Sequence, residues 1–132
     1  MLNDEQPEGA GRIMETDARD LRARTKRFAL RIIRLYSSLP KSTEAQILGK
    51  QLLRSGTSVG AHYREATRAR SSAEFVSKIE GGLQELEETV YWLELLIEAN
   101  IVDESRLCEL LRESRELIAI FVSSAKTAKK QK

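Results

Sequence analysis

The stretch SSAEFVSKIEGGLQELEETVYWLELLIEAN, residues 71–100, has the most regular apolar pattern in this chain of 132 residues. Large apolar side chains recur at alternating intervals of three and four residues, the period of one face of an α-helix. They are Val76, Ile79, Leu83, Leu86, Val90, Leu93 and Ile97. Ser71 with Glu74 forms an N-cap signal, and Asn100 suits the left-handed conformation that ends many helices. The pattern predicts a helix over residues 72–99 with one long buried face.

The same period appears on both sides of this stretch and predicts helices over residues 17–39, 43–69 and 103–126. Thr16 or Asp17 is the expected N-cap of the first and Asp103 that of the last, and the second is expected to start at Ser42 or Thr43. Pro40 ends the first helix. The expected inward positions are Leu21, Phe28, Ile32, Leu35 and Leu39; Leu48, Leu52, Val59, Tyr63 and Ala66; and Leu107, Leu110, Ser114, Leu117 and Phe121. Short connections between four long helices predict an all-α, antiparallel up-down-up-down four-helix bundle. We expect a flexible tail over residues 1–16 and a basic flexible end over 127–132.

Composition narrows the class of protein further. Residues 41–132 contain no proline, whereas sandwiches and barrels need turn residues every 8–12 positions. Apolar residues make up 41% of the chain, but no run approaches the roughly 18 residues of a membrane span. A single cysteine, Cys108, fits a reducing compartment and is expected to be a partly buried small hydrophobe. We therefore expect a cytoplasmic protein of one domain that does not enter membranes.

The formal net charge of +2 hides a strong asymmetry along the chain. Residues 12–36 carry eight bases against three acids, and residues 71–100 carry one base against seven acids. Two basic helical faces, each spanning about 80°, contain Arg24, Arg27, Arg31 and Arg34, and Lys50, Arg54, Arg64 and Arg68. Arginine forks suit phosphate, so these eight residues are the candidate nucleic-acid contacts. The alternative is a solvated face that balances the glutamates of residues 71–100, within the chain or between copies.

Three glycines of the second predicted helix lie within about 40° of one another on its surface. They are Gly49, Gly56 and Gly60. Glycine costs roughly 0.5–1 kcal/mol per helical position relative to alanine. We expect close packing of a neighbouring helix on this stripe, inside the bundle or across a subunit boundary; a bent or locally weak helix is the alternative.

The sequence contains little that points to catalysis. His62 is the only histidine, and a di-iron bundle would need Glu-x-x-His motifs that are absent. Ser58 could neighbour His62 on a helix, but only Glu65 lies near enough in sequence to orient the imidazole. No glycine-rich phosphate loop occurs. We expect no enzyme, no catalytic residue, no cofactor and no metal, with His62 in a structural role.

One family resemblance covers the bundle, roughly residues 22–126. The second helix carries RSGTSVGAHYREA at residues 54–66, the third opens with SSAEF at 71–75, and YWL follows at 91–93. In order and spacing these motifs resemble the signature of the 23S rRNA intervening sequence proteins, a family of four-helix bundles. His62 stands where that family commonly has asparagine. The place of Arg54 in the pattern implies an alternative to a phosphate contact, a structural ion pair with a glutamate of the third helix.

The resemblance implies a small bacterial protein that assembles as a ring-like homopentamer and has no known catalytic residues. A distantly similar bundle is the accessory protein of diversity-generating retroelements, a basic pentamer that binds nucleic acid and a reverse transcriptase. We therefore expect non-catalytic, low-specificity binding of structured RNA or DNA, including ribosomal RNA, by a homo-oligomer. The alternative is a protein-interaction scaffold, such as an accessory subunit of a reverse transcriptase.

Overall fold

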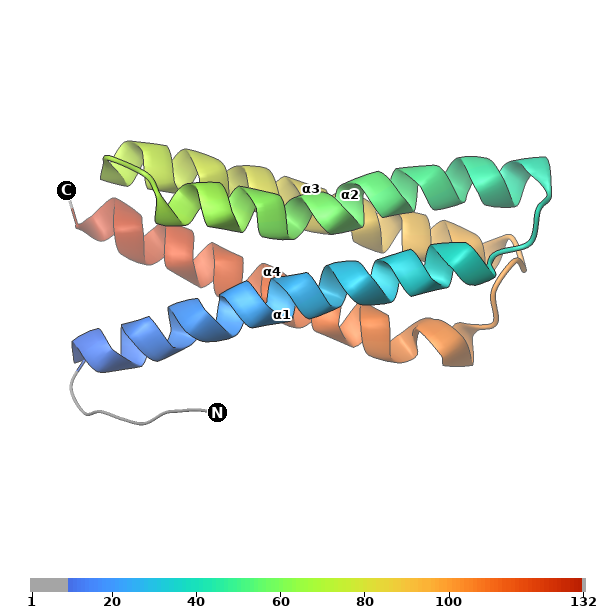
Figure 1. The fold of residues 1–132 in the computed structure, drawn as a ribbon, viewed down its shortest axis with the longest axis horizontal. Helices are drawn as coiled ribbons and strands as arrows, with labels where there is room; N and C mark the ends of the chain where they lie inside the picture. Colours follow the sequence, from blue (N-terminus) through green and yellow to red (C-terminus); the bar gives the residue numbers. More distant parts are fainter. Residues whose placement is uncertain (1–9, 132) are drawn as a thin grey trace.

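Four long helices, each antiparallel to the next, form the fold in a computed structural model that describes residues 10–131, with side chains from residue 21 onward (Figure 1). They are α1 (Ala10–Ser38), α2 (Thr43–Thr67), α3 (Ser72–Glu98) and α4 (Glu104–Lys130). Helices that follow one another in sequence pack side by side, whereas α1 and α4 approach each other least of the neighbouring pairs and cross in the view of Figure 1. The chain is the predicted all-α, up-down-up-down four-helix bundle. None of the described helices is long and apolar enough to cross a membrane.

The inner helix ends follow the local signals of the sequence. Ser42, Ser71 and Asp103 are N-caps whose side-chain oxygens accept from the backbone amides of Ala45, Glu74 and Ser105, respectively. Each cap satisfies one amide that the first helical turn would otherwise leave without a partner. Asn100 adopts a φ of 60° after α3, in the left-handed region. These predictions of helix starts and stops are confirmed to within one or two residues.

The outer helix ends differ from the prediction. Helix α1 begins at Ala10 rather than after Thr16 or Asp17, so residues 10–16 are helical; residues 1–9 of the predicted tail lie outside the described residues. Nothing between Ala10 and Asp17 ends a helix, and most of these residues favour one. Helix α4 likewise continues to Lys130, beyond the predicted end at 126. Ala128 is buried there, and lysines at a helix C-terminus interact favourably with its dipole.

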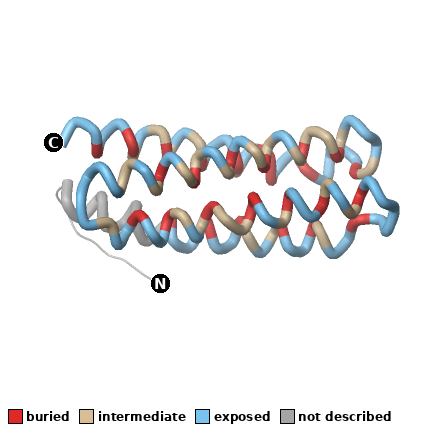
Figure 2. The backbone as a smooth tube through the Cα atoms, turned by 90° about the horizontal axis from the view of Figure 1, so that it is seen from above, coloured by how far each residue is buried: buried red, intermediate tan, exposed pale blue. Residues whose placement is uncertain are grey.

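Buried residues recur along the described length of the bundle (Figure 2). All the predicted inward positions of α1 and α4 are buried, as are those of α2 except the partly buried Leu48. Phe28, Phe121 and Ile32 are the largest fully buried side chains. Burial of such side chains contributes about 1.5–3 kcal/mol each, so the core fixes the rotation of each helix about its axis.

The buried row of α3 differs from the predicted one. Only Ile79, Leu86 and Leu93 of the seven predicted positions are fully buried. Val76, Leu83, Val90 and Ile97 are half-buried, and the last three pack against the core. The row is completed by Gly82, Thr89 and Leu96. A β-carbon at Gly82 would lie 2.6 Å from Cε2 of Phe121, so this close approach requires glycine. Small residues let α3 and α4 approach each other closely. A prediction based on the spacing of large apolar residues does not include such positions.

Candidate nucleic-acid interface

The glycine stripe of α2 packs against α1 inside the bundle. A β-carbon at Gly49 would lie 2.6 Å from Cδ1 of Leu39, and one at Gly56 would lie 2.7 Å from Cγ1 of Ile32. At Gly60 the nearest atom is Oγ1 of Thr25, at 3.2 Å. The sequence left open whether a helix packs on this stripe inside the bundle or across a subunit boundary. Among the described residues, the stripe packs inside the bundle. This tight seam holds α1 on α2 and thereby sets which side chains of α1 face outward.

Arg24, the first of the candidate phosphate contacts, is engaged within the bundle. Its Nη2 lies 2.7 Å from Oε1 of Glu113 and 3.0 Å from Oε1 of Glu116, and its Nε donates to the second oxygen of Glu113 at 3.0 Å. The side chain is 18% exposed. This bidentate pair links α1 to α4. The expectation of a guanidinium available to phosphate therefore does not hold for Arg24.

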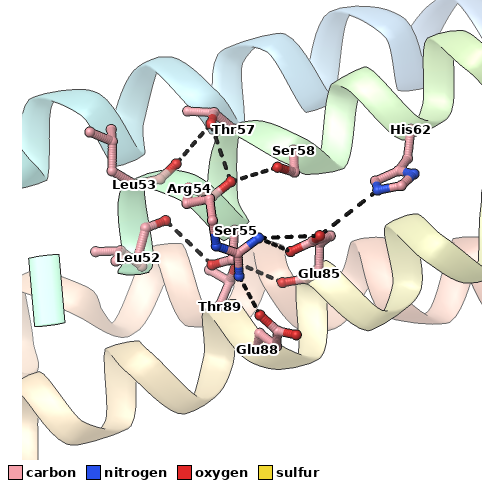
Figure 3. A network of polar contacts seen from close by, with 10 residues as sticks. All are labelled: Leu52, Leu53, Arg54, Ser55, Thr57, Ser58, His62, Glu85, Glu88 and Thr89. Carbon is pink, nitrogen blue, oxygen red and sulfur yellow. Dashed lines mark hydrogen bonds and ion pairs between the residues drawn. The ribbon is translucent and has the colours of Figure 1, made fainter. Parts of the chain in front are cut away.

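Arg54 makes a second link, from α2 to α3 (Figure 3). Its Nη2 donates to Oε1 of Glu88 at 2.6 Å, and its Nη1 donates to Oε1 of Glu85 at 3.2 Å. The hydrogen bond to Glu88 is the main cause that raises the pKa of Arg54 above its ordinary value. Beneath it, the buried hydroxyls of Ser55 and Thr89 share a hydrogen bond of 2.8 Å. Arg54 thus balances the glutamates of α3, as the alternative interpretation of the basic faces expects.

His62 lies at the edge of the same network. Its Nε2 is 3.8 Å from Oε2 of Glu85, and its ring covers the backbone of Gly81, where a β-carbon would lie 2.9 Å from the imidazole. The hydroxyl of Ser58 donates to the carbonyl oxygen of Arg54 at 2.7 Å, so it is not held by His62. Cys108 is exposed rather than partly buried, because the inward face of α4 passes through its neighbour Leu107. Among the described residues, no group of His, Cys, Asp and Glu could hold a metal ion.

The remaining six candidates make no ion pair with any side chain that the structure describes. Five are exposed and Arg31 is half-buried; on α1 they are Arg27, Arg31 and Arg34, and on α2 they are Lys50, Arg64 and Arg68. Other cations engage the acids of α3: Lys129 Nζ lies 3.0 Å from Glu80, and Arg115 Nη2 lies 3.8 Å from Glu94. The six cations are thus in excess of what the bundle pairs internally.

Two of the six lie beside a further arginine that the sequence did not single out. A hollow of about 270 Å³ between α1 and α4 is lined by Arg31, Arg34, Leu35, Ser38, Arg106, Leu107 and Leu110. Arg106 Nη2 donates to the hydroxyl of Ser38 at 3.0 Å. One signal could have found Arg106: it lies in the first turn of α4, where the helix dipole disfavours a cation.

Comparison with known proteins agrees with the resemblance of the motifs. The sequence model of the family described as "23S rRNA-intervening sequence protein" matches residues 19–123. A solved structure of a protein of unknown function from the S23 ribosomal protein family of Bacteroides thetaiotaomicron is 37% identical to this chain, with a TM-score of 0.78. The match covers 83% of this chain and 97% of that one. No curated protein matches. The bundle, its motifs and these matches together place the chain in the 23S rRNA-intervening sequence protein family.

Proposed function

We propose that this protein binds the backbone of structured RNA or DNA without catalysis and with little sequence preference, and that it acts in the cytoplasm. The contacts are the six cations of α1 and α2 that lack a carboxylate partner among the described side chains. Arginine and lysine on exposed helical faces neutralise phosphates and release counterions, irrespective of base sequence. The family description makes a structured ribosomal RNA a sensible first target.

The observation that carries this proposal is the internal pairing of α3. Arg54, Arg115 and Lys129 engage four of the seven glutamates of α3, so these four do not need the six cations as counter-charges. Five of the six cations nevertheless remain exposed, and Arg31 half-buried, on two adjacent helices. Cations that lack a carboxylate partner and recur along a helical face fit a polyanionic partner better than they fit a merely solvated face.

A salt titration tests this proposal. Binding to a fluorescent, structured ribosomal RNA fragment is followed by anisotropy for the wild type and for Arg64→Gln/Arg68→Gln. We expect the double variant to lower the slope of log affinity against log salt by about two, one unit per lost phosphate contact. The matched control is Arg112→Gln/Lys126→Gln, which removes the same charge from exposed positions of α4 and should keep the slope. Absence of binding at low salt, or equal slopes for both double variants, would refute the proposal.

We also propose that the protein works as a homo-oligomer, a ring of five by analogy with the family. Ile47 on α2 is 59% exposed and Tyr91 on α3 is 53% exposed. The antiparallel register that sets Arg54 against Glu88 brings Ile47 to the level of Leu95, one helical turn from Tyr91. The neighbouring Trp92 has a buried Nε1 with no hydrogen-bond partner among the described residues. Exposed apolar side chains on neighbouring helices are typical of association surfaces.

Light scattering tests the assembly. A concentration-independent mass of 15.0 kDa, that of one chain, would contradict it. If α2 and α3 form the contact between subunits, Ile47→Asp should reduce the mass of the assembly. The control Leu30→Asp, at another exposed apolar position on α1, should leave it unchanged.

The same apolar surface favours one alternative function, a scaffold that binds another protein such as a reverse transcriptase. Binding through apolar side chains should change little with salt, whereas phosphate binding should weaken steeply. A partner captured with equal affinity at low and high salt, together with no RNA binding, would favour the scaffold.

A further inference from the structure

We propose that the hollow between α1 and α4 is a binding site for a single phosphate group, held by Arg31, Arg34 and Arg106. The proposal deepens the proposed function, on which it rests for the source of the phosphate. The side-chain hydroxyl of Ser38, which already accepts from Arg106, lies on the same lining. Leu35, Leu107 and Leu110 complete the lining, and no carboxylate belongs to it.

A comparison of two levels of the same interface carries the argument. Arg24 and Arg31 are seven residues apart on α1, and Glu113 and Arg106 are seven residues apart on α4, so both pairs occupy equivalent faces. At the first level Arg24 faces Glu113 in a bidentate ion pair. At the second level Arg31 meets Arg106 across the hollow instead. An anion from outside the chain would occupy the place that Glu113 takes one level away.

The electrostatics of the hollow disfavour its being left without an anion. Three arginines line one small space, and their like charges repel. Arg106 also lies at the N-terminal turn of α4, where the dipole favours an acid. Elsewhere at helix interfaces, Arg24 and Arg54 both have glutamates within hydrogen-bond distance. A bound phosphate would relieve the repulsion and accept from several guanidinium N–H groups at once.

Size and lining identify the part of a ligand that fits. The volume of about 270 Å³ is below the roughly 300–1,000 Å³ of sites that enclose drug-sized ligands. No aromatic side chain lines the hollow, so a base would find no stacking surface. Arginine forks match the geometry of phosphate oxygens. The site therefore takes a phosphate group, whether a phosphodiester of RNA or a free phosphate, and does not read a base.

The first experiment measures phosphate binding to the full chain, using inorganic phosphate as the probe. Arginine Nε–H signals and the melting temperature are followed during titration at constant ionic strength. The wild type should show saturable binding and a rising melting temperature. Arg31→Gln and Arg106→Gln should each weaken binding about tenfold or more, through loss of hydrogen bonds to a charged group. Arg112→Gln, an exposed change on α4 outside the lining, should bind like the wild type.

A second arm distinguishes the two sources of phosphate. If the source is RNA, Arg106→Gln weakens binding of the RNA fragment and lowers its salt slope by about one. If the source is free phosphate, the variant loses inorganic phosphate only, and the hollow still stands as a site. Loss of neither ligand, or equal losses in Arg112→Gln, would overturn the proposal. The proposed function would survive that result if Arg64→Gln/Arg68→Gln still lowers the salt slope.

A third variant tests the repulsion itself. Arg106→Glu copies the arrangement of Arg24 and Glu113, so it should melt higher than Arg106→Gln in phosphate-free buffer and gain nothing from added phosphate. A lower melting temperature than Arg106→Gln, with a native circular dichroism spectrum, would contradict the like-charge argument.

Discussion

Gly56→Ala tests how tightly α1 and α2 are packed. The added β-carbon would lie 2.7 Å from Cγ1 and 2.9 Å from Cγ2 of Ile32, the first about 0.7 Å inside the 3.4 Å limit of ordinary contact. Ile32 is fully buried and branched at its β-carbon, so it cannot turn away easily. Overpacking of this kind costs about 1–3 kcal/mol. Alanine regains about 1 kcal/mol of helix propensity over glycine.

The matched control is Gly60→Ala on the same face. Its β-carbon would lie 3.2 Å from Oγ1 of Thr25, so a shift of a few tenths of an ångström suffices. The propensity gain is the same, and this variant should be neutral or stabilised by up to about 1 kcal/mol. We therefore expect Gly60→Ala to be more stable than Gly56→Ala by about 2 kcal/mol.

Urea denaturation followed by circular dichroism, at one protein concentration, measures the difference. In the Ile32→Ala background the clash is absent, so Gly56→Ala should become stabilising there, which gives a coupling energy of at least about 1 kcal/mol. Equal stability of Gly56→Ala and Gly60→Ala, or no coupling with Ile32→Ala, would refute the close-packing argument.

Three further changes separate structural from binding roles. Arg54→Gln should lower the free energy of unfolding by about 1 kcal/mol, because a half-exposed ion pair contributes little, and should leave the salt slope of RNA binding unchanged; a lower slope would return Arg54 to the binding surface. His62→Asn should leave RNA binding and oligomer mass as in the wild type, and a large loss with the fold intact would reopen a catalytic role. The side-chain hydrogen bond from Ser105 lowers the pKa of Asp103 below 3.8, so the stability that this cap contributes is present above the unfolded-state pKa and lost as the pH falls through the folded-state pKa. Acid unfolding of Asp103→Asn should lack this component, and an unchanged acid profile would contradict it.

Local chemistry explains why the inner helix ends could be predicted. Pro40, Ser71, Asn100 and Asp103 act on backbone groups within a few residues of themselves, so their effects do not depend on the rest of the fold. At the start of α1 the cap signal of Thr16 or Asp17 was misleading, because the helix already runs through both residues from Ala10. At the end of α4, burial of Ala128 helps extend the helix, and that burial depends on tertiary packing.

Apart from the pairing of Arg54 with a glutamate of α3, which was one expected alternative, the partners of the arginines could not be predicted, because they depend on the register between helices. Arg24 and Arg27 both lie on the basic face of α1 in the sequence, yet only Arg24 comes within reach of the glutamates of α4. Arg54 and Arg64 differ in the same way on α2. A rotation or shift of one helix by a single turn would exchange these partners without changing any helical period.

The amino-acid sequence by itself determined that this chain forms four amphipathic helices. Apolar residues that recur every three or four positions lie on one face of a helix, and only that face can be buried. It also determined where the three connections between the helices lie, and it contains the family motifs. Only the tertiary structure decided that Gly82 and Thr89 complete the buried row of α3, and that Arg106 joins Arg31 and Arg34 around one hollow. Those outcomes depend on distances between residues far apart in the chain, which close packing sets to a fraction of an ångström.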